Sequence, residues 1–304
     1  MSIDAAEFLQ ASVRTATPLA LAAYGELVAE RAGVINLGVE GAMIAGAFGA
    51  LVGAGVAGVT GGFAVAVLAG AMTAALMVFV VLWLRADAVI AGTAISMLAL
   101  GLTGTLYRTL YGAQGAALSL PTLAPVALPG VADLPLIGRA LFEQPVVTYA
   151  LYAMAAALGW WFSRTHGGLA LRAVGERPEA AVAAGVSPIR VRALALLFAG
   201  AMGGLAGGVL VLAQVGTFAE GMTAGRGFLA IAIVVLGRWS PLGVAGAALL
   251  FGAASQLQYV FQSLGWAVPY QLFLALPYLL TLLVLAGTQR RARAPGSLGA
   301  PLDY

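Results

Sequence analysis

Polar side chains inside apolar stretches are the residues of this sequence that could contact a ligand. Asn36 and Glu40 are four residues apart, so a helix would carry both on one face. Asn36 offers a donor and an acceptor, and Glu40 can accept hydrogen bonds from hydroxyl or amide groups. An ionisable group at membrane depth costs about 2.5–3.5 kcal/mol and usually faces a cavity or a partner. The pair therefore predicts a polar substrate route.

Phe228 is the aromatic side chain nearest to a second group of unusual residues. It follows the run 225–227, which reads GRG. Its ring could stack on a ring of a ligand or pack against lipid.

Glu40 also has a structural alternative to ligand contact, which is an ion pair with Arg31 or Arg226 that holds two helices in register. Both interpretations stay open at this point.

The residue types needed for catalysis are nearly absent. Without Lys the chain cannot form a Walker A loop, and without Cys it has no thiolate chemistry, disulfide or Cys-based metal site. His166 is the only His, and we interpret it as a solvated loop residue, with a proton-linked role as the alternative. Gly53, Gly55 and Gly58 spell G-x-G-x-x-G inside an apolar stretch, which favours helix packing or a bend over dinucleotide binding. We expect no catalytic residue, no metal site and no cofactor bound by this chain.

Composition places the chain in a membrane. Of its 304 residues, 62% are hydrophobic and 9% are charged, against about 25% charged in soluble domains. A helix needs about 20 apolar residues to cross the hydrocarbon core. The apolar runs predict an all-α polytopic bundle of about nine spans (eight to ten), near residues 15–29, 34–57, 63–84, 88–107, 146–163, 193–213, 219–237, 241–261 and 266–287.

Two of these segments are weak as simple spans. Residues 15–25 and 227–237 each contain only 11 residues free of charge, which extend about 16 Å as a helix. Short, glycine-interrupted apolar segments in corresponding parts of two halves are a sequence signal for a transport site. Small residues at 200, 203, 204, 207 and 208 have the spacing that lets helix backbones approach closely, which is packing rather than chemistry.

The distribution of arginines predicts the orientation, because positively charged loops remain in the cytoplasm. With the C-terminus inside, Arg14, Arg108, Arg139 and Arg226 fall outside or near the outer face. The other eleven arginines then fall inside, at positions 31, 85, 164, 172, 177, 190, 192, 238, 290, 291 and 293. The N-terminus is expected outside, and the protein in the cell membrane.

This topology divides the chain into one membrane domain with two functional connections. We expect an extracytoplasmic N-terminus at 1–14, a transmembrane domain at 15–288 and a cytoplasmic tail at 289–304. The outer connection 110–145 holds five prolines, which predict an irregular cap or docking surface. The inner connection 164–192 holds five arginines.

A short helix is predicted inside the inner connection, at 178–184. Proline suits the first turn of a helix, so Pro178 marks its start, and Glu179 suits the positive end of the helix dipole. Gly185 suits the left-handed position after the last turn, and Pro188 follows. The small side chains of Ala180, Ala181 and Ala184 leave room for a partner to approach closely.

At these residues the sequence becomes similar to a known family. Residues 30–41 (ERAGVINLGVEG) resemble the opening signature of the branched-chain amino acid, ribose and nucleoside permease superfamily. Residues 225–237 (GRGFLAIAIVVLG), followed by PLG at 241–243, resemble its second hallmark. Residues 171–185 (LRAVGERPEAAVAAG) are similar to the loop through which these permeases contact their ATPase. The resemblance covers about residues 12–288 and is closest to the shorter permease of nucleoside importers with lipoprotein receptors.

The resemblance implies an ABC importer permease fold of the second type. It implies a longer paralogous permease as partner, a cytoplasmic ATP-binding subunit that holds ATP and magnesium, and an extracytoplasmic substrate-binding lipoprotein, with lipids around the spans and no nucleic acid. Asn36, Glu40, Arg226 and Phe228 would lie in or near the substrate pathway. The implied coupling residues are Gly175, Glu176, Pro178, Glu179, Ala180, Ala181, Ala184 and Gly185. The family commonly has Asn where Arg177 stands.

Other functions fit parts of the sequence. Close relatives within the superfamily handle simple sugars such as ribose, so a sugar permease is the alternative substrate class. An ion-coupled secondary transporter would use buried carboxylates, and Glu26, Glu30 and Glu40 are available. Such a carrier has no need for the arginine-rich inner connection with its short helix. A membrane enzyme would have little beyond carboxylates to work with.

Overall fold

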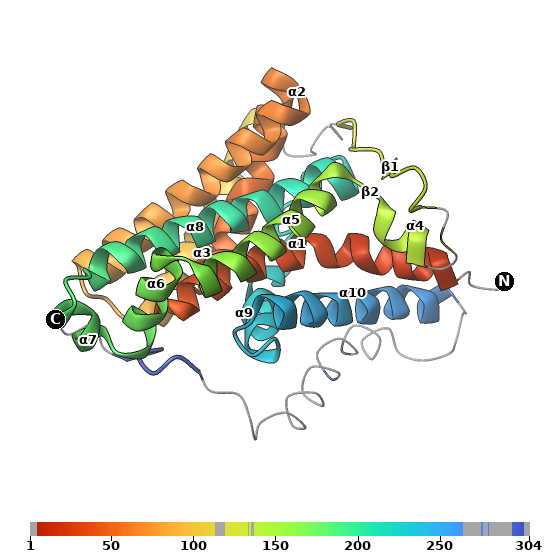
Figure 1. The fold of residues 1–304 in the computed structure, drawn as a ribbon. Coiled ribbons are helices and arrows are strands. Elements are labelled where there is room, and N and C mark those ends of the chain that lie inside the picture. Colours follow the sequence, from red (N-terminus) through yellow and green to blue (C-terminus); the bar gives the residue numbers. More distant parts are fainter. Residues whose placement is uncertain are drawn as a thin grey trace.

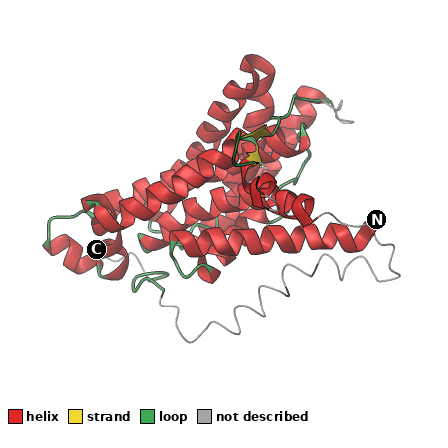
Figure 2. Cartoon of the chain, turned by 45° about the vertical axis from the view of Figure 1, so that its right-hand side comes forward, coloured by secondary structure: helices red, strands yellow, loops and turns green. Residues whose placement is uncertain are grey.

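Helices form almost all of the regular structure. The structure is a computed structural model that describes residues 5–112, 119–132, 134, 137–263, 275, 279 and 294–300. Within these residues the only strands are β1 (Val126–Ala127) and β2 (Glu143–Gln144), which pair antiparallel (Figure 2). The helices are α1 (Ala5–Arg31), α2 (Val39–Val78), α3 (Ala88–Tyr111), α4 (Ile137–Phe142), α5 (Val146–Arg164), α6 (His166–Glu176), α7 (Pro178–Ala183), α8 (Pro188–Val209), α9 (Arg226–Leu236) and α10 (Pro241–Ser263). Two π-helical turns, η1 (Phe79–Trp83) and η2 (Leu210–Val215), extend α2 and α8. The predicted all-α class is confirmed.

The helix α1 is the central element of the bundle. It packs against α8, α9 and α10 (Figure 1). Its 27 residues extend about 40 Å. Residues 15–29, whose first part is weak as a simple span by charge-free length, belong to a full-length helix, because α1 continues without a break through Glu26 and Glu30 to Arg31. The side chains of Glu26 and Glu30 are 0% and 1% exposed, so protein separates both carboxylates from lipid.

The helix α2 is a hairpin of two antiparallel arms. Its dihedral angles leave the helical region at Ala57 (φ −130°, ψ 22°) and Gly58 (φ 68°, ψ −170°). The two arms then pack on each other, so that a Cβ atom placed on Gly53 would lie 2.7 Å from the carbonyl oxygen of Gly61. The predicted spans 34–57 and 63–84 are these two arms. The glycines at 53, 55 and 58 mark the bend between them, as expected.

Glycines bring α2 and α8 into backbone contact. A Cβ atom on Gly46 of the first arm would collide with the backbone of Gly204 in α8. A Cβ atom on Gly70 of the second arm would collide with the backbone of Gly200 and Gly204. Without side chains the three helices approach closely enough for extensive van der Waals contact, which drives helix association in lipid. The predicted packing role of these glycines is confirmed.

The described part of the outer connection is largely irregular, as its prolines predict. Its described part lies against the end of α8, where the Leu120 and Leu123 amides donate to the carbonyl oxygens of Gly216 and Leu212. The same connection also contains the six-residue helix α4 and the strand pair β1–β2, neither of which was predicted.

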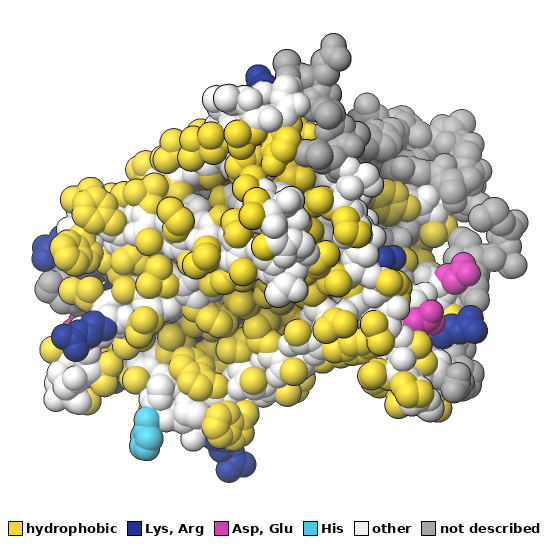
Figure 3. Space-filling model, turned by 90° about the horizontal axis from the view of Figure 1, so that it is seen from above, with side chains coloured by type: hydrophobic (Ala, Val, Ile, Leu, Met, Phe, Trp, Pro, Cys, Tyr) yellow, Lys and Arg dark blue, Asp and Glu magenta, His cyan; other side chains and the backbone are white. Residues whose placement is uncertain are grey.

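Among the residues that the structure describes, five helical stretches are long and apolar enough to cross a membrane: Val39–Trp83, which contains the hairpin, Ala88–Tyr111, Val146–Arg164, Pro188–Val215 and Pro241–Phe261. Hydrophobic side chains cover most of the face seen in Figure 3. The chain is therefore a multi-pass membrane protein. The predicted last span, 266–287, lies outside the described residues, and the count of nine stays a prediction.

The two ends of the bundle differ in charge. Arg31, Arg85 and Arg192 lie at the end where α1 finishes, together with α6, α7 and residues 294–300 (Figure 1). We call this the arginine-rich end. Arg14 lies at the opposite end, where its carbonyl oxygen accepts from Gln214.

Candidate substrate pathway and coupling site

The helix α9 is too short to cross a bilayer by itself. Its 11 residues extend about 16 Å, against about 30 Å for the hydrocarbon core. The preceding residues, 216–225, form turns with left-handed conformations at Gly216, Gly221, Ala224 and Gly225. Sequence reasoning left open whether 219–237 is a full span or a broken helix. In the structure residues 219–225 are irregular and only Arg226–Leu236 is helical.

Glu40 holds the amino end of α9. Its Oε1 accepts from the hydroxyl of Thr223 at 2.6 Å and the amide of Gly225 at 2.9 Å, and its Oε2 accepts from the amide of Gly227 at 2.6 Å. A carboxylate is favoured here because the first amides of a helix lack partners and carry partial positive charge. A Cβ atom on Gly227 would lie 2.5 Å from the Cα atom of Glu40, so only glycine permits this approach.

Glu30 holds the other end of α9. The indole nitrogen of Trp239 donates to Glu30 Oε2, and Arg31 Nε donates to the carbonyl oxygen of Trp239 at 2.8 Å. Arg238 and Trp239 both have positive φ, which tightens the turn into α10. The two carboxylates together form what we call the α9 clamp. The segments 30–41 and 225–243 thus contact each other, and sequence reasoning missed the role of Glu30 and Trp239.

Asn36 does not share a helix face with Glu40, and that expectation was wrong. The helix α2 begins at Val39, and Asn36 lies in the irregular junction 32–38. Asn36 is 2% exposed, and its backbone amide donates to Glu26 Oε1 at 2.9 Å. Asn36 therefore shapes the turn from α1 into α2.

The proposed ion pair of Glu40 with Arg31 or Arg226 is not formed either. Arg31 donates to Trp239, and Arg226 Nη1 donates to the carbonyl oxygen of Met222 at 2.8 Å. Glu40 has the structural role that was the alternative to ligand contact, but it fulfils that role through hydrogen bonds.

The residues before and at the start of α9 present an exposed face that combines an ion pair with apolar side chains. Glu220 forms a bidentate ion pair with Arg108 of α3, and the two side chains are 39% and 62% exposed. Ala224 is exposed and Phe228 is 42% exposed. We call this set the pathway face. Charges and non-helical backbone are costly against lipid tails, so we expect this face to lie against protein or water.

The predicted short helix of the inner connection is present as α7. It starts at Pro178, ends at Ala183 and is followed by Gly185 at φ 80°. The Gly185 amide donates to Val182 O and the Val186 amide to Ala181 O, both at 2.9 Å, which is a Schellman cap. The start and stop signals are confirmed.

The predicted coupling residues divide into exposed and buried ones. Ala181 is 2% exposed, so the expectation that it leaves room for a partner was wrong. Gly175 is also buried, because its Cα packs on the backbone of Arg31 and leaves no space for a side chain. Pro178 is half-buried. The side chains open to a partner are Glu176, Glu179, Ala180 and Ala184, beside the exposed Gly185.

Comparison with known proteins identifies the family. The family model described as "Branched-chain amino acid transport system / permease component" matches residues 8–285. The chain belongs to this permease family. Guanosine ABC transporter permease protein NupQ of Bacillus subtilis is 36% identical to it over 94% of this chain and 93% of its own. Nucleoside ABC transporter permease protein NupC of Lactococcus lactis is 31% identical over 93% and 92%.

A sugar transporter subunit is also similar. Glucose ABC transporter permease protein TsgB13 of Haloferax volcanii is 31% identical over 78% of this chain and 65% of its own. No solved structure matches the chain significantly.

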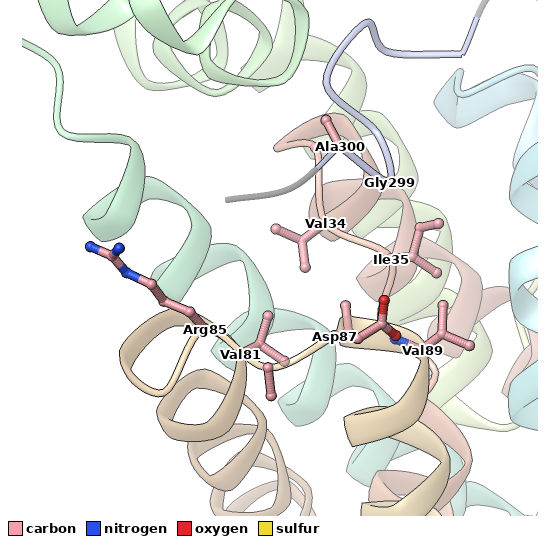
Figure 4. Close-up of a pocket in the computed structure, with 11 residues that line it drawn as sticks. Val34, Ile35, Val81, Arg85, Asp87, Val89, Gly299 and Ala300 are labelled. Carbon is pink, nitrogen blue, oxygen red and sulfur yellow. The ribbon is translucent and has the colours of Figure 1, made fainter. Parts of the chain in front are cut away.

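Two hollows of the permease remain to be assigned. A cavity of about 310 Å³ lies at the arginine-rich end, between the junction 32–38, the start of α3 and residues 299–300 (Figure 4). Asp87 lines it, but its Oδ1 caps α3 by accepting from Val89 and Ile90, and Arg85 points away. A groove of about 590 Å³ between α5 and α8 has apolar walls, including Trp160 and Phe198, and suits hydrocarbon rather than a polar substrate. The described residues contain no cluster of three potential metal ligands.

Proposed function

We propose that this permease is the shorter membrane subunit of an ATP-driven nucleoside importer. Two relatives that cover nearly all of the chain are named for guanosine or nucleoside transport. The observation that carries the proposal is the pathway face: exposed, non-helical backbone beside a half-helix fixed at both ends. Discontinuous helices of this kind form substrate sites in transporters.

The pathway face suits a nucleoside that passes between two permease subunits. Phe228 offers a ring on which a base can stack, and Arg226 stands two residues before it. Asn36 and Glu40 would not contact the nucleoside themselves, because Asn36 fixes the junction and Glu40 fixes α9. A second, longer permease would cover the face and supply its other wall.

The remaining partners follow from the two ends of the molecule. We place the arginine-rich end in the cytoplasm. An ATP-binding subunit would then contact α7 and hold the ATP and magnesium. A substrate-binding lipoprotein would meet the opposite end, at the outer connection. The permease itself needs no cofactor for this role, and chemistry would occur only on the ATPase.

Reconstitution of the complete transporter tests the proposal. Liposomes containing both permeases and the ATPase, with the receptor protein added, should accumulate radiolabelled guanosine only when ATP and magnesium are inside. Omission of this chain should abolish uptake. Guanosine uptake that persists without ATP, and stops when an ionophore collapses the proton gradient, would support the secondary carrier instead.

A simple sugar is the second candidate substrate, favoured by the similarity to the glucose transporter subunit. The same liposomes decide between them. Unlabelled glucose or ribose in excess should leave guanosine uptake unchanged if the substrate is a nucleoside. ATP-dependent uptake of labelled sugar without uptake of guanosine would establish the sugar permease.

A further inference from the structure

The segment 294–300 is docked on the permease rather than extended into solvent. Pro295 and Ser297 are buried, and Ser297 is 6% exposed. The Ser297 amide and hydroxyl both donate to the carbonyl oxygen of Gly175, each at 2.8 Å. The amide of Gly296 donates to Glu176 Oε2 at 3.3 Å. The segment is thus bonded to the last residues of α6, immediately before the coupling helix α7.

A buried arginine joins the same segment to two further elements. Arg192 of α8 is 1% exposed. Its Nε donates to the carbonyl oxygen of Ala32 at 3.0 Å, and its Nη2 donates to the Ser297 hydroxyl at 3.2 Å. A charged group is costly to bury unless it is hydrogen-bonded, so these contacts fix the relative positions of α8, the junction and the segment.

The contacts lie between the coupling helix and the α9 clamp. The Ser297 hydroxyl occupies the space that a side chain on Gly33 would need, and Figure 4 shows Gly299 and Ala300 beside Val34 and Ile35. Gly33 and Ile35 belong to the junction that leads through Asn36 to Glu40. A displacement of α6 and α7 at the arginine-rich end therefore reaches the junction by two routes, directly where Gly175 packs on Arg31 and through this segment (Figure 1).

We propose that residues 294–300 are a strap that transmits movement from the coupling helix to the α9 clamp, with Ser297 and Arg192 as its positioning residues. The strap stays docked throughout the transport cycle, because its use is to make α6, α8 and the junction move as one body. This inference rests on the proposed coupling role of α7.

The substitution Ser297→Ala in the complete transporter tests the strap. It removes the hydroxyl that Arg192 and Gly175 share but keeps the backbone amide bond. We expect membrane insertion and ATP hydrolysis to persist, while guanosine transported per ATP hydrolysed falls about fivefold or more, because both hydrogen bonds by which the hydroxyl holds the segment are lost. Ser187→Ala is the matched control, because Ser187 is exposed and makes no capping bond with its side chain. An unchanged ratio, or a proportional fall of uptake and hydrolysis, would overturn the coupling role.

A second measurement decides the case if Ser297→Ala does not fold. Ser297→Cys gives this Cys-free chain a single thiol at the buried position. We expect it to resist a membrane-permeant maleimide with and without ATP, while Ser187→Cys reacts readily. A thiol at position 297 that becomes reactive during turnover would show a releasable latch instead of a strap. Failure of the parent transporter to move guanosine counts against the proposed function. A parent that transports guanosine, together with a Ser297→Ala variant that keeps the parent's ratio of guanosine to ATP, counts against the strap alone.

Discussion

Glu40 Oε2 lies 2.6 Å from the backbone nitrogen of Gly227. This contact joins the first turn of α2 to the first turn of α9, although the two residues are 187 positions apart in the chain. The sequence suggested that the Glu40 carboxylate contacts a ligand. In the structure it caps α9, a helix that is too short to span the bilayer. The substrate would then meet the helix that Glu40 fixes, rather than Glu40 itself.

Removal of this cap should destabilise the permease. Glu40→Gln replaces one accepting oxygen with an NH₂ group, so at least one of the three donors loses its partner. An unsatisfied buried donor costs about 1–3 kcal/mol. We expect a lower melting temperature in detergent and reduced uptake. Glu179→Gln, at an exposed carboxylate, is the control; equal melting temperatures for both variants would contradict the clamp.

Phe228 should contribute to substrate affinity. Stacking of a base on an aromatic side chain contributes about 1–3 kcal/mol. We therefore expect Phe228→Ala to raise the KM for guanosine about 5- to 150-fold, and Phe228→Tyr to retain most of the affinity. Leu242→Ala removes a side chain that is 86% exposed at the start of α10 and should leave KM unchanged. Similar KM values for Phe228→Ala and the parent would exclude the ring from the pathway.

The orientation can be measured with single cysteines, because the chain has none of its own. Ser187, at the arginine-rich end, and Thr122, in the outer connection, are both exposed. We expect an impermeant thiol reagent to label Thr122→Cys in intact cells and Ser187→Cys only after permeabilisation. The reverse pattern would invert the topology.

The exposed side of α7 should contact the ATPase. Ala180→Trp adds a bulky ring on that side, so we expect loss of ATP-driven uptake with membrane insertion unchanged. Thr122→Trp in the outer connection is the control and should transport normally. Ala181→Trp is a different experiment, because its ring would enter the buried side and should lower the yield of folded protein. Normal uptake by Ala180→Trp would remove α7 from the ATPase contact.

Local signals in the sequence were sufficient for much of the fold. Pro178 and Gly185 act within their own turns, so the start and stop of α7 could be predicted from them. The glycines of α8 were also assigned correctly, because close helix approach needs small residues at a fixed spacing. The bend at Gly58 follows from the same kind of local reasoning, since only glycine adopts its dihedral angles without strain.

The site was less predictable because its contacts are long-range. The spacing of Asn36 and Glu40 suggested one helix face, but Asn36 lies in a junction whose shape depends on Glu26. The burial of Ala181 depends on how α7 docks on the rest of the bundle. The length of α1 was underestimated because only its charge-free residues were counted. Glu26 and Glu30 continue the helix, since protein rather than lipid surrounds their carboxylates. The partners of Glu30 and Glu40, more than 180 positions away, are set only by the folded bundle.

The clamp also constrains the order in which the protein can be made. An 11-residue helix is too short to enter a bilayer as an independent span. Its two anchoring carboxylates lie upstream of it, in α1 and α2, and the chain is synthesised from its N-terminus. Both anchors are therefore already in the membrane when residues 216–240 leave the ribosome. The half-helix α9 therefore enters the membrane by docking onto helices that are already inserted. Substitution of Glu30 or Glu40 would leave α9 without the groups that hold it there.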